Sequence, residues 1–203
     1  MVHAHEGHTR ATMKIQEGCD RWCTYCIIPS VRGPIRSRPV DEIAAEAQSL
    51  AEAGFKEVVL TGIHLTSYGR DVKDGTTLLD AIRAAHDVPG IARVRLGSLE
   101  PVVVTPEFVE GIKALPKVCH QFHLALQSGS DTVLTRMHRR YTSGEFLTAC
   151  AMLREAFEDC ALTTDVMTGF PGETEEEFAQ TKDTCTKAGF ARMHVFPYSE
   201  RSC

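Results

Sequence analysis

The sequence predicts an α/β fold, a partial (β/α)6 barrel of the TIM type. Six short runs rich in valine, isoleucine, leucine and threonine alternate with longer amphipathic segments. This alternation is typical of parallel strands, buried on both faces, and of their connecting helices. Right-handed crossovers curl such repeats toward a barrel, and six are fewer than the eight that close one. Because 203 residues suit one sizeable core, we expect a tail over residues 1–11 and one core domain over residues 12–203.

The expected strands are short and spread along the whole chain. The last one ends a few residues before Cys203, and no helix is expected after it. In chain order they are Thr12–Gln16, Glu57–Leu60, Arg93–Leu96, Phe122–Leu126, Leu162–Met167 and Met193–Phe196.

Four of the intervening helices have recognisable beginnings. Asp41 can cap the first of them, and a plain cap by Ser130 is the alternative to a ligand-binding role at the start of the helix that follows the fourth strand. Thr105 opens another, because the proline after it is favoured at the first helical position. Thr174, three residues before Glu177, predicts a capping box.

The active face is expected at the carboxyl ends of the strands, where βα folds carry their functional residues. The segments concerned are 17–26, 61–64, 97–100, 127–130, 168–171 and 197–201. Candidate site residues are therefore sought in these six segments.

Composition narrows the class of protein. The net charge of −5 argues against a chain that holds nucleic acid by bulk electrostatics, although it leaves room for a local basic patch. No apolar run approaches the roughly 20 residues of a membrane span, and the polar N-terminus lacks a signal peptide. Of eight cysteines, three are clustered and five scattered, which favours a metal site in a reducing cytoplasm over a disulfide scaffold.

The clustered cysteines are Cys19, Cys23 and Cys26, in the run EGCDRWCTYCIIP directly after the first expected strand. Three thiolates are one short of the four that complete a structural zinc site or a 4Fe-4S cluster. A cluster held by three cysteines keeps one iron open for another ligand. The alternative is a zinc knuckle that recruits a fourth ligand such as His64, but no second cysteine or histidine pair completes a zinc pattern.

This run and its continuation, CTYCIIPSVRGPIRSRP, resemble the radical S-adenosylmethionine (SAM) superfamily and its methylthiotransferase branch. Further matching segments are LTGIHLTSYGRD, RLGSLEP, HLALQSGSD, MHRRYT, DVMTGFPGET and FPYS, so the resemblance covers the chain from about Thr9 onward. Residues 62–64 (GIH) followed by residues 67–69 (SYG) favour the tRNA N6-threonylcarbamoyladenosine methylthiotransferases over the isopentenyladenosine and ribosomal-protein relatives.

The resemblance implies a fold of the radical SAM type, two cofactors and a reaction. Cys19, Cys23 and Cys26 would hold a 4Fe-4S cluster whose open iron binds the amino and carboxylate groups of SAM. Reductive cleavage of SAM would give a 5'-deoxyadenosyl radical that abstracts hydrogen from the adenine ring of the substrate nucleotide.

The resemblance also assigns SAM or substrate contacts to strand-end residues. The loop at Gly62 would meet the amino group of SAM, Gln127 a ribose or the substrate base, and Phe170 the adenine of SAM. The full set of predicted cofactor-binding residues is Gly62, Ser98, Glu100, Gln127, Arg140, Gly169 and Phe170. Ordinary βα turns, a solvated loop glutamate and a plain helix cap are the alternatives at these positions.

Two basic clusters stand out against the acidic balance. The first comprises Arg32, Arg36 and Arg38, and the second Arg136, His138, Arg139 and Arg140. One of them would hold the SAM carboxylate and either would touch tRNA phosphates, while a solvated charged face is the alternative. Cys150 and Cys185 fall on helices and are expected to be buried small hydrophobes. The alternating histidines of the tail indicate a linker.

Complete methylthiotransferases carry an N-terminal domain with a second cluster and a C-terminal RNA-binding TRAM domain, and we expect neither here. Three hypotheses follow. The chain is the radical SAM core of a tRNA methylthiotransferase, a stand-alone radical SAM protein without sulfur transfer, or a non-catalytic iron–sulfur or zinc module. The first implies tRNA as a partner, bound largely by the missing domains, a flavodoxin-type electron donor and no membrane.

Overall fold

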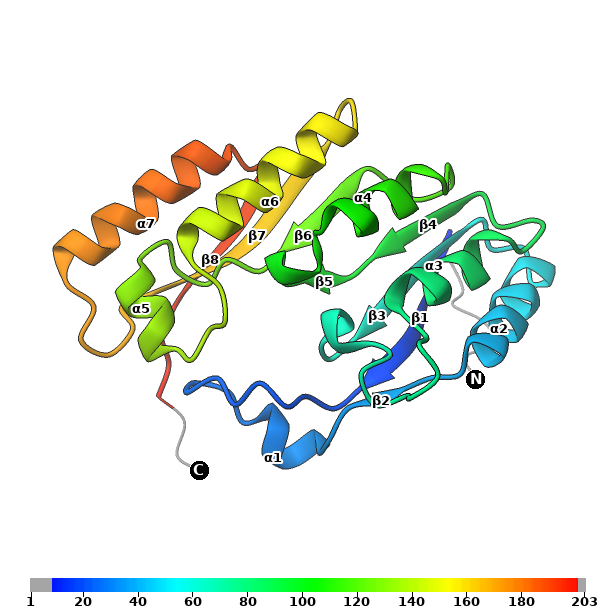
Figure 1. The fold of residues 1–203 in the computed structure, drawn as a ribbon, viewed down its shortest axis with the longest axis horizontal. Helices are drawn as coiled ribbons and strands as arrows, with labels where there is room; N and C mark the ends of the chain where they lie inside the picture. The colour runs from blue at the N-terminus through cyan, green and yellow to red at the C-terminus, as the bar shows by residue number, and fades with distance from the viewer. Residues whose placement is uncertain (1–8, 201–203) are drawn as a thin grey trace.

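The computed structural model describes residues 9–200, which form an open half-barrel (Figure 1). The predicted fold class is confirmed. The strands are β1 (Arg10–Glu17), β2 (Arg36–Ser37), β3 (Glu57–Gly62), β4 (Arg93–Leu96), β5 (Ser98–Leu99), β6 (Gln121–Leu124), β7 (Ala161–Thr168) and β8 (Arg192–Pro197). The helices are α1 (Ile28–Arg32), α2 (Val40–Glu52), α3 (Leu78–His86), α4 (Pro106–Lys113), α5 (Asp131–Arg136), α6 (Ser143–Ala156) and α7 (Glu175–Ala188), with 3-10 turns η1 (Leu65–Ser67) and η2 (Pro101–Val103).

The strands form two four-stranded groups joined by one bent stretch of chain. Their orders are β2-β1-β3-β4 and β5-β6-β7-β8, and every pairing except that of β1 with β2 is parallel. The chain passes from β4 to β5 through Gly97, whose N–H donates to the Leu60 carbonyl oxygen at 2.8 Å. A parallel bridge between Val94 and Val118 continues the ladder toward β6. The sheet therefore curls through the bend between β4 and β5.

All six predicted strands are present; Arg93–Leu96 has the predicted bounds, and the other five have shifted ends. β1 begins at Arg10, two residues inside the segment predicted as a tail, whereas the tail histidines lie outside the described residues. β6 ends at Leu124 rather than Leu126, because the Leu126 N–H donates at 3.0 Å to the side-chain hydroxyl of Thr164 in β7 instead of to a backbone carbonyl of that strand.

The prediction that the strands are buried on both faces is wrong. Exposed and buried residues alternate along β1, and every residue of β8 is exposed. The helices lie along one side of the strands (Figure 1), and that side carries the apolar core, which includes Leu60, Leu96, Phe122 and Leu124. The other side of the described half-barrel has no opposite strands to pack against, so polar side chains occupy it.

Two of the predicted helix caps are confirmed. The Thr105 hydroxyl accepts from the Phe108 N–H at 3.2 Å at the start of α4. Thr174 and Glu177 form the expected capping box of α7, each side chain accepting from the other residue's backbone N–H. These local signals satisfy amide groups that the first turn of a helix leaves without partners.

The caps predicted at Asp41 and Ser130 are wrong. α2 begins directly after Pro39, so Asp41 lies within the first turn, where its charge favours the helix dipole without capping an amide. Ser130 stands at the N-cap of α5, but its hydroxyl contacts the Thr132 hydroxyl at 3.0 Å rather than a backbone amide.

A continuous chain of polar contacts, the polar belt, crosses the helix-free side of the sheet from β3 to β8. Its members in order are Glu57, Arg95, Gln121, Thr163, His123, Asp165 and His194, and successive side chains lie 2.8–3.3 Å apart. Because β3 and β4 belong to one strand group and β6, β7 and β8 to the other, the belt ties the two groups together.

Thr163→Val is expected to destabilise the chain by about 1–2 kcal/mol, because it removes the one hydroxyl that contacts both Gln121 and His123. Urea unfolding measures the change. Thr186→Val is the matched control, since that exposed hydroxyl only bonds within its own helix, and it should shift stability by less than about 0.5 kcal/mol. If the two substitutions changed the free energy of unfolding equally, the hydroxyl of Thr163 in the polar belt would contribute nothing specific to stability.

Candidate functional site

The cysteine loop (residues 18–27) follows β1 at the carboxyl edge of the sheet. Gly18 opens it with a φ of 72°, and a Cβ atom there would lie 1.9 Å from the Pro34 carbonyl oxygen, so only glycine fits. The Cys19 N–H donates to the Gly33 carbonyl at 3.1 Å, and the Cys26 N–H to the Cys23 carbonyl at 2.9 Å. Backbone hydrogen bonds therefore fix the loop at both ends of the cysteine run.

The three thiols share one neighbourhood but lie at different depths. Cys23 is buried, Cys19 and Cys26 are half-buried, and all three are free. Burial raises the pKa of the Cys19 thiol, and the nearby Cys23 and Cys26 add to the rise. Within residues 9–200, no three His, Cys, Asp or Glu side chains converge tightly enough to hold one metal ion.

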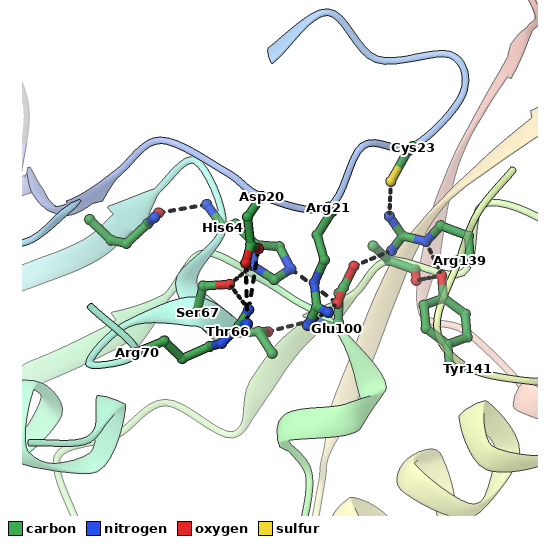
Figure 2. Close-up of polar contacts among 12 residues, drawn as sticks. Asp20, Arg21, Cys23, His64, Thr66, Ser67, Arg70, Glu100, Arg139 and Tyr141 are labelled. Atoms are coloured by element: carbon green, nitrogen blue, oxygen red, sulfur yellow. Dashed lines mark hydrogen bonds and ion pairs between the residues drawn. The ribbon is translucent and has the colours of Figure 1, made fainter. Parts of the chain in front are cut away.

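A buried carboxylate, Glu100, lies beside the cysteine loop and contacts two arginines and a histidine (Figure 2). Its Oε2 lies 3.2 Å from Arg21 Nη2 and 3.0 Å from His64 Nε2, while its Oε1 lies 2.9 Å from Arg139 Nη2. Arg21 belongs to the loop, His64 follows β3 and Arg139 follows α5. We call these four residues the Glu100 cluster, and it connects four segments that are distant in sequence.

Electrostatics within the Glu100 cluster leave a positive excess. Burial alone would raise the pKa of the Glu100 carboxyl, but the close contact with His64 and the charges of Arg139 and Arg21 lower it to about 2. Both arginines stay protonated in proteins, so at neutral pH two buried positive charges face one negative charge. The buried Arg21 Nε has no hydrogen-bond partner among the described residues. A set of anionic thiolates would balance this excess, so these residues fit a cysteine-held iron–sulfur cluster.

A pocket of about 380 Å³ opens beside Cys26 at the carboxyl ends of β6, β7 and β8. Tyr25, Cys26, Gln127 and Tyr198 are among its lining residues. Phe170 packs against two of these lining residues. Its ring lies edge-on to that of Tyr25, with centroids 6.4 Å apart, and to that of Tyr198, with centroids 5.6 Å apart. The structure therefore brings Gln127 and Phe170, two of the predicted binding residues, to the cysteine loop.

Four other predicted binding residues do not line this pocket. Ser98 is exposed in β5, and Gly169 is exposed while its N–H donates to the Glu173 carboxylate at 2.6 Å. Arg140 is exposed and forms no ion pair within the described residues, whereas its neighbour Arg139 belongs to the Glu100 cluster. Gly62 ends β3 and faces Gln16, as described next.

Gly62 is required by packing inside the protein. Its Cβ would lie 2.9 Å from both the Cβ and the Oε1 of Gln16. The Gln16 side chain is buried and fixed, since its Nε2 donates to the Glu17 and Gly18 carbonyls and its Oε1 accepts from the His64 N–H. Gln16 thus holds the end of β1, the start of the cysteine loop and the turn after β3 together.

Gly62→Ala is expected to destabilise the chain by about 1–3 kcal/mol, because Gln16 cannot move without losing these three hydrogen bonds. Urea unfolding measures the loss. Gly144→Ala is the control, since a Cβ there meets only Thr142 Oγ1 at 3.9 Å and alanine favours the helix α6. A stable Gly62→Ala chain would show that the turn has room for a side chain.

The sequence analysis missed the roles of Gln16, Arg21, Tyr25 and Arg139. Arg139 was recognised only as part of a basic cluster, and its Nη1 lies 3.5 Å from Cys23 Sγ. The alternation of β1 gives no signal for the role of Gln16, because it assigns this residue to the exposed face of Thr12 and Lys14, whereas Gln16 is buried where the register with β3 shifts. No sequence pattern separates Arg139 from Arg140, because the left-handed His138, with a φ of 57°, reorients the chain just before them.

Comparison with known proteins agrees with this geometry. The model of the family described as the Radical SAM superfamily matches residues 13–185, which include the cysteine loop and the Glu100 cluster. The chain belongs to the Radical SAM superfamily. A radical SAM methyltransferase, TsrM from Kitasatospora setae, solved with cobalamin and a [4Fe-4S] cluster, has the same fold, with a TM-score of 0.75 at 19% identity over 92% of this chain and 36% of that one.

Two curated relatives of this radical SAM chain are much closer in sequence. The threonylcarbamoyladenosine tRNA methylthiotransferase MtaB of Bacillus subtilis is 45% identical over 99% of this chain and 45% of its own length. The tRNA-2-methylthio-N(6)-dimethylallyladenosine synthase of Acetivibrio thermocellus is 40% identical over 95% of this chain and 40% of its own length. The chain therefore spans less than half the length of these relatives.

Proposed function

We propose that this chain is the radical SAM core of a tRNA methylthiotransferase. Cys19, Cys23 and Cys26 would hold a 4Fe-4S cluster, and SAM would occupy the pocket beside Cys26. When bound, the cluster supplies the electron that cleaves SAM to a 5'-deoxyadenosyl radical. The observation that carries the proposal is the cysteine loop at the carboxyl edge of the sheet, with Cys26 on the pocket wall.

The chain's own residues would position SAM and exclude water. Gln127 presents a side-chain amide to the pocket from a left-handed backbone, with a φ of 64°, that hydrogen bonds to Asp165 and Met167 hold in place. Tyr25 and the supporting Phe170 offer an apolar surface that suits the adenine of SAM. The predicted SAM contacts at Ser98, Gly169 and Arg140 have less support, since these residues are exposed away from the pocket lining.

Glu100 has a different proposed role from the SAM contact predicted from its position. Both of its carboxylate oxygens already contact buried cations, so neither is available to a ligand without breaking the cluster. We therefore assign it to the support of the cysteine loop.

The proposed substrate is a tRNA whose adenosine beside the anticodon carries an N6 modification. Both curated relatives are named for such a modified adenosine, and the 45% identity to an MtaB favours N6-threonylcarbamoyladenosine. A flavodoxin-type electron donor and a cytoplasmic location belong to the same proposal. In the part of the chain that the structure describes, no helix has the length and apolar character to cross a membrane.

The test is anaerobic reconstitution of the chain with iron and sulfide, followed by dithionite, SAM and tRNA that carries N6-threonylcarbamoyladenosine without the methylthio group. Mass spectrometry then measures 5'-deoxyadenosine and methylthiolated nucleosides. Methylthiolated threonylcarbamoyladenosine, from this chain or from a longer protein that contains it, supports the proposal. Release of 5'-deoxyadenosine without methylthiolation in both would favour the stand-alone radical SAM protein. A cluster that never cleaves SAM would leave only the non-catalytic module.

A further inference from the structure

Arg139 lies directly against Cys23, and its orientation is fixed on every side (Figure 2). Its guanidinium places Nη1 3.5 Å from Cys23 Sγ, Nη2 2.9 Å from Glu100 Oε1 and Nε 3.0 Å from the Tyr141 hydroxyl. The same group stands 5.0 Å from the centre of the Tyr141 ring, and its side chain is only 8% exposed. Arg139 thus aims a buried, permanent positive charge at one of the three cysteine sulfurs.

The partners of Arg139 are themselves anchored. The Tyr141 hydroxyl donates to the backbone carbonyls of Ala125 and Leu126, at 2.6 and 3.0 Å, beyond the end of β6. Glu100 is also contacted by Arg21 and His64. Because the surrounding residues over-determine its position, the guanidinium cannot swing away from Cys23 at little cost.

We propose that Arg139 is a positioning residue that donates to the Cys23 sulfur and, together with Glu100, sets the reduction potential of the cluster. This inference rests on the proposed function, because it requires the cysteines to hold that cluster. Hydrogen bonds to ligand sulfurs, local net charge and solvent exposure are what tune the potential of an iron–sulfur centre. Arg139 supplies the first two and restricts the third.

The signs of the effects follow from charge. Reduction transfers one electron from dithionite to the cluster and forms or breaks no bond, so the cluster becomes more negative by one charge. A cation at the Cys23 sulfur stabilises that reduced state and raises the potential. Glu100 offsets part of this cation, so it lowers the potential. Removing the charge of Arg139 and removing the charge of Glu100 must therefore shift the potential in opposite directions.

The experiment compares the reconstituted wild-type chain with Arg139→Gln, Arg139→Lys and Glu100→Gln, without SAM or tRNA. Iron and sulfide content is measured first, and the midpoint potential is then measured by a mediated redox titration followed by electron paramagnetic resonance. We expect Arg139→Gln to shift the potential downward, Arg139→Lys to shift it downward by less, and Glu100→Gln to shift it upward. Arg140→Gln is the matched control, because that neighbouring cation is exposed and screened by solvent.

Each outcome decides the inference. Arg139→Gln at or above the wild-type potential, with equal iron content, overturns it. If Arg139→Gln takes up no cluster, the Arg139→Lys variant decides instead. A midpoint potential of Arg139→Lys at or above that of the wild type again overturns the inference. If the two residues had only a structural role, Arg139→Gln and Glu100→Gln would shift the midpoint potential in the same direction, or neither would shift it. A wild-type chain that takes up no cluster contradicts the proposed function itself, which distinguishes that failure from this one.

Discussion

Cys19→Ala, Cys23→Ala and Cys26→Ala are each expected to abolish reductive SAM cleavage, with a loss of more than about 100-fold in 5'-deoxyadenosine. Three thiolates are already one fewer than the four that saturate a cluster. Removing any one leaves two, which cannot hold the cluster while also keeping an iron open for SAM. Iron and sulfide content after anaerobic reconstitution should fall together with cleavage, and both are measured on the same sample.

The matched control is Cys119→Ala. Cys119 is a free, half-buried cysteine that lies just before β6, at the amino end of the sheet and therefore at the edge opposite the cysteine loop. It should keep wild-type iron content and cleavage. A variant of the clustered cysteines with wild-type iron and wild-type product would contradict the ligand assignment for that residue. Loss of iron in the Cys119 variant would show that reconstitution failed for reasons of folding.

Local sequence signals predicted the fold because the strands and helix caps depend mainly on residues that are close together in the sequence. The periodicity of the six strands placed them within a few residues, and the Thr174–Glu177 box was correct. The same signal was present at Thr77–Asp80 and Thr142–Glu145, which open α3 and α6, two helices that were not assigned individually. The alternation of polar and apolar residues in β1 (RATMKIQE) was itself a signal of one exposed face, which the expectation of strands buried on both faces overlooked. Which face is covered still depends on elements elsewhere in the chain.

The candidate site was only partly predictable for a related reason. The cysteine spacing identified the loop, because the chemistry depends on residue type and local spacing. The Glu100 cluster depends on four segments meeting in space, and neither Arg21 nor Arg139 has a sequence neighbour that indicates this. Glu100 was selected for its position at a strand end, but its surroundings give it protein partners. Gly62 was selected as a ligand contact, and its lack of a side chain serves the packing of Gln16.

Glu100→Ala is expected to destabilise the chain by about 3–5 kcal/mol at pH 7. The substitution leaves Arg21 and Arg139 buried without their counter-ion, and an uncompensated buried charge is far more costly than the loss of an exposed pair. Urea unfolding of the metal-free chain measures the change. Glu42→Ala, which removes an exposed partner of Arg38, is the control and should cost at most about 1 kcal/mol.

The pH dependence gives this prediction a second, independent readout. The pKa of Glu100 is lowered from its ordinary 4.5 to about 2 in the folded chain. A carboxylate with a lowered pKa contributes its full stabilisation above the unfolded value and loses it as the pH falls through the folded value. The stability difference between the wild type and Glu100→Ala should therefore be constant above about pH 5 and shrink steadily between pH 4.5 and pH 2. A difference that persists unchanged at pH 2 would mean that Glu100 stabilises the fold by packing rather than by charge, and the ion-pair assignment would be wrong.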